Sequence, residues 1–271
     1  MKTDADLPRD APDRLARQLV WPLGWVEGLG LAAWTLASCL RHYGRILLGR
    51  DRLDVPAFAW SLRQSGLSIL PAITLVGIAV GAILGNQTQI VLAHFNLPEL
   101  VMLSIKYGVV MELVPILVGI LVAGRAGVAL AVRQAALSVS GEVDGLLITG
   151  VDPIQYTVAP ALLVMLIMSF AFAVWASLVT FAASFLWLWL VVELPPALFL
   201  ESLRSVLGPA DLLESILKPM LFALLIALIA SVNGTAAGRD PLNVGEAATR
   251  TMIGAVTAIL IADLAVILLV R

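Results

Sequence analysis

Residues 121–153 read LVAGRAGVALAVRQAALSVSGEVDGLLITGVDP, and this stretch decides how the rest of the chain is interpreted. It contains many small residues, two arginines and three acidic residues, and it is helix-prone. The flanking sequence is far more apolar: no residue is charged from Pro153 through Val192, and only two are charged between Glu99 and Arg125. A polar helical segment between two membrane spans predicts a docking surface for a protein in the water.

Composition favours a membrane protein independently of any motif. The 271-residue chain is 60% hydrophobic and 13% charged, whereas soluble domains average about 45–50% apolar and about 25% charged residues. Because a span needs roughly 20 apolar residues, we predict an all-α integral membrane protein with about five transmembrane helices. Residues 153–192 could form one long helix or two short ones. The predicted spans are 64–94, 98–123, 154–191, 211–236 and 246–270.

The first 55 residues differ from the rest. Apolar residues, tryptophans and arginines are interleaved there, which is typical of an amphipathic helix lying in the membrane interface. An additional span near Trp25–Leu40 is the alternative. We therefore divide the chain into an interfacial helix with its linker (1–55) and a transmembrane domain (56–271) that includes a cytoplasmic coupling segment (124–152). No cleavable signal peptide is expected, and the single cysteine excludes an internal disulfide.

Arginine and lysine set the predicted orientation. With the N-terminus inside, nearly all of the basic residues outside the spans fall on the cytoplasmic side, as the positive-inside rule requires. The coupling segment 124–152 then lies in the cytoplasm, and residues 192–212 face outward.

Two patterns mark the first predicted span. Gly77, Gly81 and Gly85 recur every four residues, a spacing that lets another helix approach closely; the partner helix is either in the same chain or in a second copy. An apolar stripe follows toward the outer leaflet, and it could face lipid or line a transport cavity. Its members are Leu84, Thr88, Val91, Leu92 and Phe95.

Two charges fall where charges are costly. Glu112 lies within the second predicted span and Lys218 near the start of the fourth. An intramembrane ionisable residue is a functional candidate, although a structural ion pair explains it equally well. Asp263 is expected to form a helix–helix hydrogen bond. The sequence has no phosphate-binding loop and no motif for a metal or for nucleophilic catalysis, so we expect a non-enzymatic chain without a cofactor or metal.

Several ordered motifs carry a family resemblance. The chain contains Glu112-Leu113-Val114-Pro115, then Ala123-Gly124-Arg125-Ala126-Gly127, then Val151-Asp152-Pro153 with Pro160, and later NGTAAGRDPLNVGEAATRTMI from Asn233. From about Pro56 to the C-terminus it resembles the MlaE-type permeases of the Mla and MCE-associated ABC lipid transporters. It departs from their pattern where they have arginine in place of Met111, glycine in place of Val114 and glutamate in place of Arg133.

The resemblance implies the permease subunit of an ABC transporter in the bacterial inner membrane. Such a permease moves phospholipid or a similar lipid between that membrane and an extracytoplasmic MCE-domain protein. A separate ATPase subunit would bind the ATP. Further partners would be a second permease copy, membrane lipids and, in many such systems, a STAS-domain subunit; no nucleic acid is expected. Candidate ATPase-coupling residues are Arg125, Gly127, Arg133, Glu142, Asp144 and Asp152. Candidate substrate-binding residues are the five of the apolar stripe with Glu112, Leu113 and Lys218.

Other functions remain to be weighed. A structural or regulatory subunit without transport activity is the main rival, and one half of a heterodimeric permease is another. A secondary transporter would need repeated broken helices with paired charges, which the sequence lacks. Lipid class and direction of transport are left open by the sequence.

Overall fold

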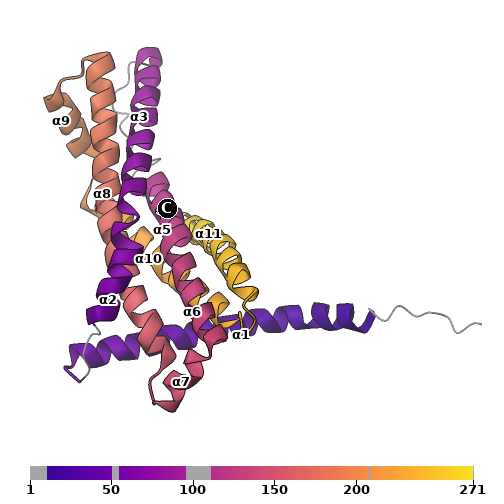
Figure 1. The fold of residues 1–271 in the computed structure, drawn as a ribbon. Coiled ribbons are helices and arrows are strands. Elements are labelled where there is room, and N and C mark those ends of the chain that lie inside the picture. Colours follow the sequence, from indigo (N-terminus) through magenta and orange to yellow (C-terminus); the bar gives the residue numbers. More distant parts are fainter. Residues whose placement is uncertain (1–10, 51–54, 96–110, 207, 271) are drawn as a thin grey trace, which may run out of the picture.

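A computed structural model describes residues 11–50, 55–95, 111–206 and 208–270, and every regular element in these ranges is helical. Figure 1 shows a tall helical bundle with one helix lying across its foot. The elements are α1 (Ala11–Leu47), α2 (Val55–Leu62), η1 (Arg63–Leu67), α3 (Leu70–Phe95), α5 (Val114–Val122), η3 (Ala123–Gly127), α6 (Val128–Ser140), α7 (Glu142–Ile148), η4 (Ile154–Val158), α8 (Ala159–Val192), α9 (Pro196–Val206), α10 (Pro209–Thr235) and α11 (Asn243–Val270).

Five helical runs are long and apolar enough to cross a membrane, which confirms the predicted class. The ends of these runs differ from the predicted ends by up to about 17 residues, and the largest difference is at the end of the second run. α8 is a single helix of 34 residues, so the region after residue 153 forms one span. At about 1.5 Å per residue this helix is about 51 Å long and exceeds a hydrocarbon core of about 30 Å. The runs are Val55–Ile90, Met111–Ser140, Ile154–Val192, Leu213–Thr235 and Asn243–Leu269.

The N-terminal helix α1 crosses the foot of the bundle, transverse to α3 and α8 (Figure 1). It is not among the candidate spans, so the expected interfacial helix is found and the alternative of a sixth span is not. The Tyr43 hydroxyl donates a hydrogen bond of 2.6 Å to the Ala159 carbonyl oxygen and ties α1 to the start of α8. Trp34 is exposed, and the Arg41 guanidinium lies 5.2 Å from its ring centre.

The most extensive helix–helix contact in the bundle is that of α3 with α8, and the three regularly spaced glycines bring these helices close together. A Cβ atom on Gly85 would come within 2.6 Å of Trp187 Cβ, and one on Gly81 would collide with the Thr180 carbonyl oxygen. A Cβ on Gly77 would lie 3.0 Å from Val179 Cγ1. The partner helix of this glycine face is therefore α8 of the same chain.

The polar segment 121–153 is divided between two parts of the structure. Residues 111–140 form one continuous helical run, so the second span extends well past residue 123. Gly141, with φ of 75°, ends α6, and only the short helix α7 projects beyond the foot of the bundle (Figure 1). No residue of α7 is buried. The first half of the predicted coupling segment 124–152 packs in the bundle with α10 and α11, and the docking role of the segment stays a prediction.

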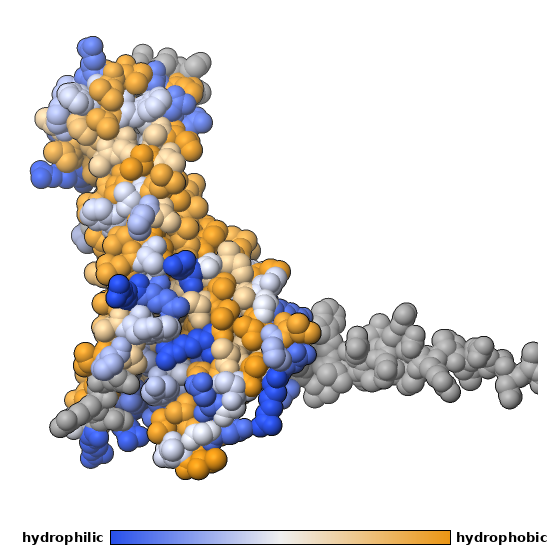
Figure 2. Space-filling model, in the orientation of Figure 1, coloured by the Kyte–Doolittle hydropathy of each residue, from blue (hydrophilic) through white to orange (hydrophobic). Residues whose placement is uncertain are grey.

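Figure 2 shows how surface polarity follows this arrangement. Apolar side chains cover most of the shaft that α3 and α8 form, whereas hydrophilic residues gather near its two ends. The shaft therefore has the surface expected of a membrane-embedded body, and α7 lies on the polar side of the foot.

Candidate functional site

A buried ion cluster lies between α10, α11 and the start of the second span. The Lys218 ammonium is 3.1 Å from Glu112 Oε2, 3.2 Å from Asp263 Oδ1 and 3.4 Å from Glu214 Oε1. It also donates a hydrogen bond of 2.9 Å to the Met111 carbonyl oxygen. The Lys218 side chain is only 2% exposed. We call these four charged residues the Lys218 cluster.

Three helical segments supply the Lys218 cluster. Glu214 and Lys218 are four residues apart on α10, so they share one helix face. Glu112 comes from the π-helical turn that precedes α5, and Asp263 comes from α11. Sequence reasoning placed Glu112 and Lys218 in one polar patch without requiring contact. It missed Glu214, although the i, i+4 spacing was visible, and it gave Asp263 only a hydrogen bond.

The geometry of the cluster decides what Lys218 can bind. An ammonium has three donor hydrogens, and four oxygen atoms of the same chain already surround this one within 3.4 Å. Its contacts to the Met111 carbonyl oxygen and Glu112 Oε2 are hydrogen bonds, and Glu214 and Asp263 lie at ion-pair distance, so acceptors of the same chain already surround the ammonium. The cluster connects α10, α11 and the second span, and removing one partner of a buried ion pair is strongly destabilising.

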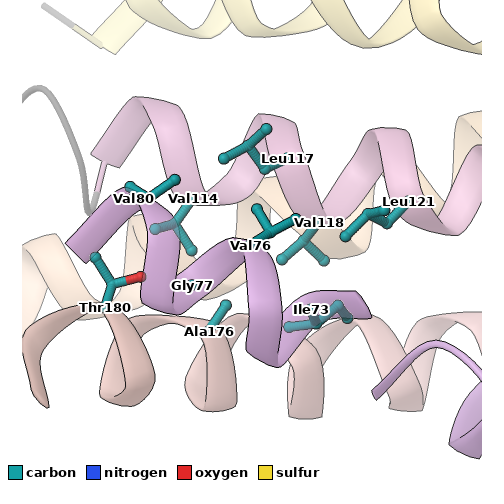
Figure 3. Close-up of a pocket in the computed structure, with 10 residues that line it drawn as sticks. All are labelled: Ile73, Val76, Gly77, Val80, Val114, Leu117, Val118, Leu121, Ala176 and Thr180. Carbon is teal, nitrogen blue, oxygen red and sulfur yellow. The ribbon is translucent and has the colours of Figure 1, made fainter. Parts of the chain in front are cut away.

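An apolar groove lies between α3, α5 and α8 (Figure 3). Its empty space is about 240 Å³ when the solvent at its open side is included. Valine and leucine side chains of α3 and α5 meet there above Gly77 and Ala176, and the Thr180 hydroxyl is the polar side-chain group among the lining residues. The lining residues are Ile73, Val76, Gly77, Val80, Val114, Leu117, Val118, Leu121, Ala176 and Thr180. We call this space the α3–α5–α8 groove.

The predicted apolar stripe only borders this groove. Leu84 is half-buried against the core and Thr88 is buried, while Leu113 is 41% exposed. The side chains of Val91, Leu92 and Phe95 lie outside the described residues. The groove residues Val76 and Val80 precede Leu84 by eight and four residues, so the same i, i+4 periodicity, followed toward the N-terminus, would have found them.

Three of the proposed ATPase-coupling residues contact other helices of the bundle, although Arg125 is itself exposed. A Cβ on Gly127 would come within 2.5 Å of Ile226 Cγ2. Arg125 Nε donates to Ser68 Oγ at 3.3 Å, and the Arg133 guanidinium lies 4.6 Å from the Trp60 ring centre. These contacts place Gly127, Arg125 and Arg133 beside the first, fourth and last spans rather than on the projecting helix.

The other three lie at the projecting end. Glu142 and Asp144 are exposed on α7, and Asp144 pairs with Arg239 at 2.6 Å. Asp152 Oδ1 accepts a hydrogen bond of 2.9 Å from the Ile154 backbone N–H, which caps the start of the third span. The end of the molecule that projects from the bundle is thus formed by α7 and the turn after it.

The single cysteine is not a reactive site. Burial, with a smaller effect of the Asp152 charge, raises the pKa of the Cys39 thiol to about 12. The thiol thus stays protonated at neutral pH. Within the described ranges, no group of three or more histidine, cysteine or acidic residues could hold a metal ion.

Five long apolar helical runs, a transverse N-terminal helix and a short projecting helix are the fold of a multi-pass membrane protein. Residues 58–269 match the family model Permease MlaE, and the chain belongs to this family. It is accordingly an ABC transporter permease, a subunit type that does not itself hydrolyse ATP.

Curated relatives agree with this assignment. The chain is 27% identical over 262 residues to the intermembrane phospholipid transport system permease protein MlaE of Haemophilus influenzae, covering 88% of this chain and 94% of the relative. It is 26% identical over 198 residues to a probable ABC transporter permease protein of Rickettsia conorii, covering 73% and 76%. A chloroplast protein of Arabidopsis thaliana, TRIGALACTOSYLDIACYLGLYCEROL 1, is 28% identical over 152 residues, 56% of this chain and 43% of that protein.

Proposed function

We propose that this permease moves phospholipid between the bacterial inner membrane and an extracytoplasmic MCE-domain protein. The observation that carries the proposal is the α3–α5–α8 groove, an almost wholly apolar space within the spans. An acyl chain gains about 0.8 kcal/mol per CH₂ when it leaves water for such a wall. The similarity to a permease named for intermembrane phospholipid transport supports the same substrate class.

The groove requires no catalytic group for this task. Lipid transfer breaks no covalent bond, so the chain needs only to change the shape of an apolar space when its ATPase partner turns over. Two copies of the chain would form the transporter, with the N-terminus of each in the cytoplasm, as the basic residues of the inner segments favour. The Lys218 cluster would fix three helices around the substrate path without touching the lipid.

Helix α7 is the proposed docking element for the ATPase. Its last residues, Leu147 and Ile148, are 59% and 86% exposed, an unusual state for large apolar side chains that face water. A hydrophobic tip flanked by the exposed carboxylates of Glu142 and Asp144 suits insertion into a partner's cleft. A STAS-domain subunit could bind on the same side, outside α7.

Photo-crosslinking tests the lipid path. A photoreactive residue at Val80 or Leu117 should capture phospholipid from the complex with its ATPase, and the yield should change when ATP is added. A probe at Ile261, which is 63% exposed on α11, provides a control for ordinary bilayer contact. Equal, ATP-independent capture at all three positions would show that the groove is not part of a transport path.

A second measurement separates transport from a structural role. The permease and its ATPase should co-purify, and phospholipid should stimulate ATP turnover in the reconstituted complex. The variant Ile148→Asp should lose the ATPase, whereas Leu242→Asp, a matched change at another exposed residue (85%), should retain it. Co-purification without lipid-stimulated turnover would favour the non-transporting subunit. A requirement for a second, different permease would favour the heterodimer.

A further inference from the structure

A small recess at the foot of the bundle contains polar groups that the fold does not use. It lies between α2 and η1 on one side and α6 on the other, with α8 at its base, and its empty space is about 230 Å³ when the solvent at its open side is included. It is distinct from the α3–α5–α8 groove and from the Lys218 cluster. Its lining residues are Trp60, Ser61, Gln64, Ser65, Ala129, Leu130, Arg133 and Ala161. We call it the Arg133 recess.

Two hydrogen-bond donors of this recess have no partner. Ser61 is 2% exposed, and its hydroxyl makes no hydrogen bond. The Nη1 atom of Arg133 is also buried without an acceptor. Among the residues that the structure describes, no carboxylate lies within ion-pair distance of Arg133. Buried donors are normally satisfied by protein or by a ligand, so two unsatisfied donors lining one recess indicate a missing acceptor.

The guanidinium is held in a fixed position. Its carbon lies 4.6 Å from the ring centre of Trp60, within the range of a cation–π contact. This contact leaves the edge of the planar group available, and a guanidinium edge matches the spacing of phosphate oxygens. A phosphate has enough acceptor oxygens to satisfy both Arg133 and Ser61.

The depth of the recess selects the kind of phosphate. Ser61 lies six residues after the start of the first candidate span, and Arg133 lies seven residues before the end of the second. At about 1.5 Å per residue both are roughly 10 Å inside those ends, and α2 and α6 both lie in the lower part of the bundle, toward α1 (Figure 1). Trp60 and Leu67 are 49% and 57% exposed, and tryptophan favours the headgroup level of a bilayer.

We propose that the Arg133 recess binds the phosphate of a phospholipid in the cytoplasmic leaflet. Arg133 and Ser61 donate hydrogen bonds to its oxygens, Trp60 packs beside the headgroup, and an acyl chain runs along the apolar surface near Leu67. This binding does not depend on the proposed transport function, because a non-transporting subunit with the same recess would hold the lipid equally well.

Native mass spectrometry of the full-length chain with added phosphatidylglycerol tests the proposal. Removing a hydrogen bond to a charged group costs roughly 10- to 100-fold in affinity, so Arg133→Gln should weaken the tightest lipid-binding event at least about tenfold. Ser61→Ala should weaken it about threefold, and Arg133→Lys should retain part of it. Arg63→Gln, which changes an exposed arginine two residues from Ser61, is the matched control and should have no effect.

Three results would overturn the proposal. In the first, folded Arg133→Gln protein binds phosphatidylglycerol as tightly as the natural chain, or Arg63→Gln weakens binding equally. In the second, inorganic phosphate at millimolar concentration displaces the lipid completely, which would identify a site for the free ion. In the third, Arg133→Gln releases the ATPase while lipid binding is unchanged, which would make Arg133 part of a protein interface. If Arg133→Gln does not fold, Ser61→Ala and Arg133→Lys decide by the same criterion.

Discussion

Lys218 and Arg133 are both basic residues inside the helical bundle, but their surroundings are opposite. Lys218 has four oxygen atoms of its own chain within 3.4 Å, whereas one guanidinium nitrogen of Arg133 is buried with none. The first arrangement surrounds its ammonium with acceptors without a ligand and connects three helical segments, although Asp263 Oδ1 in it makes no hydrogen bond. In the second arrangement, the guanidinium nitrogen gains a hydrogen-bond partner only when a ligand supplies an acceptor. A buried charge in a membrane protein therefore indicates a ligand-binding site only where the protein itself leaves that charge without a hydrogen-bond partner.

The largest effect is expected at Lys218. Its replacement by methionine leaves three acidic side chains around an apolar group, and breaking a buried ion pair costs about 3–5 kcal/mol. We expect Lys218→Met to lower the yield of folded protein sharply, measured by size-exclusion chromatography and thermal unfolding. Glu214→Gln, at a residue whose side chain is 21% exposed, is the milder control. Folded, stable Lys218→Met protein with impaired lipid retention would instead assign the lysine to the substrate path.

The sequence predicted the architecture well because the bilayer constrains it strongly. Five apolar runs, an interfacial first helix and the glycine face of α3 follow from length, composition and spacing, all of which are local properties. The extent of the coupling segment stays a prediction, because small residues such as Gly127 are typical of close helix packing as well as of a turn. Whether this segment stays in the bundle depends on the contact between Gly127 and Ile226, which are 99 residues apart in the chain.

The contacts at the candidate sites were less predictable, because they too join residues that lie far apart in the chain. Glu112 and Lys218 could be identified as unusual from their positions alone, but the number of carboxylates around the ammonium depends on how α10 and α11 pack. The Arg133 recess joins Ser61 to a helix that begins more than 60 residues later. Sequence reasoning noted Arg133 for its charge and assigned it to the ATPase interface, since nothing local indicates the ring of Trp60.

A smaller loss of stability is expected from the α3–α8 contact. Gly81→Ala would force a methyl group against the backbone of α8 at Thr180, and overpacking of this kind costs about 1–3 kcal/mol. Gly30→Ala in α1, where no atom lies within 4 Å of the added Cβ, should be neutral or slightly stabilising because alanine favours helix. Thermal unfolding of both variants in the same detergent measures the difference, and equal midpoints would contradict the close packing.

At the projecting helix, activity should change far more than stability. Asp144 and Arg239 form a pair whose side chains are 57% and 78% exposed, and such pairs contribute less than about 1 kcal/mol. Asp144→Lys should therefore leave the unfolding midpoint nearly unchanged while it weakens ATPase association and lipid-stimulated turnover. Arg239→Ala removes the same ion pair without reversing the charge of α7, so it should retain the ATPase. Loss of the ATPase in both variants would point to the ion pair rather than to the surface of α7.

The smallest change in intrinsic stability is expected at Arg133, and it sharpens the contrast with Lys218. Without lipid, Arg133 has no acidic partner among the described residues, so Arg133→Gln removes a costly unsatisfied donor along with the Trp60 contact. These two effects oppose each other, since a cation–π contact is worth about 0.5–1 kcal/mol at an exposed ring. We expect the free energy of unfolding of the delipidated variant to differ from that of the natural chain by less than about 1 kcal/mol.

Added phosphatidylglycerol should then stabilise the natural chain but not the Arg133→Gln variant, because only binding to the folded state raises the unfolding midpoint. Equal stabilisation of both proteins would mean that Arg133, like Lys218, serves the fold alone.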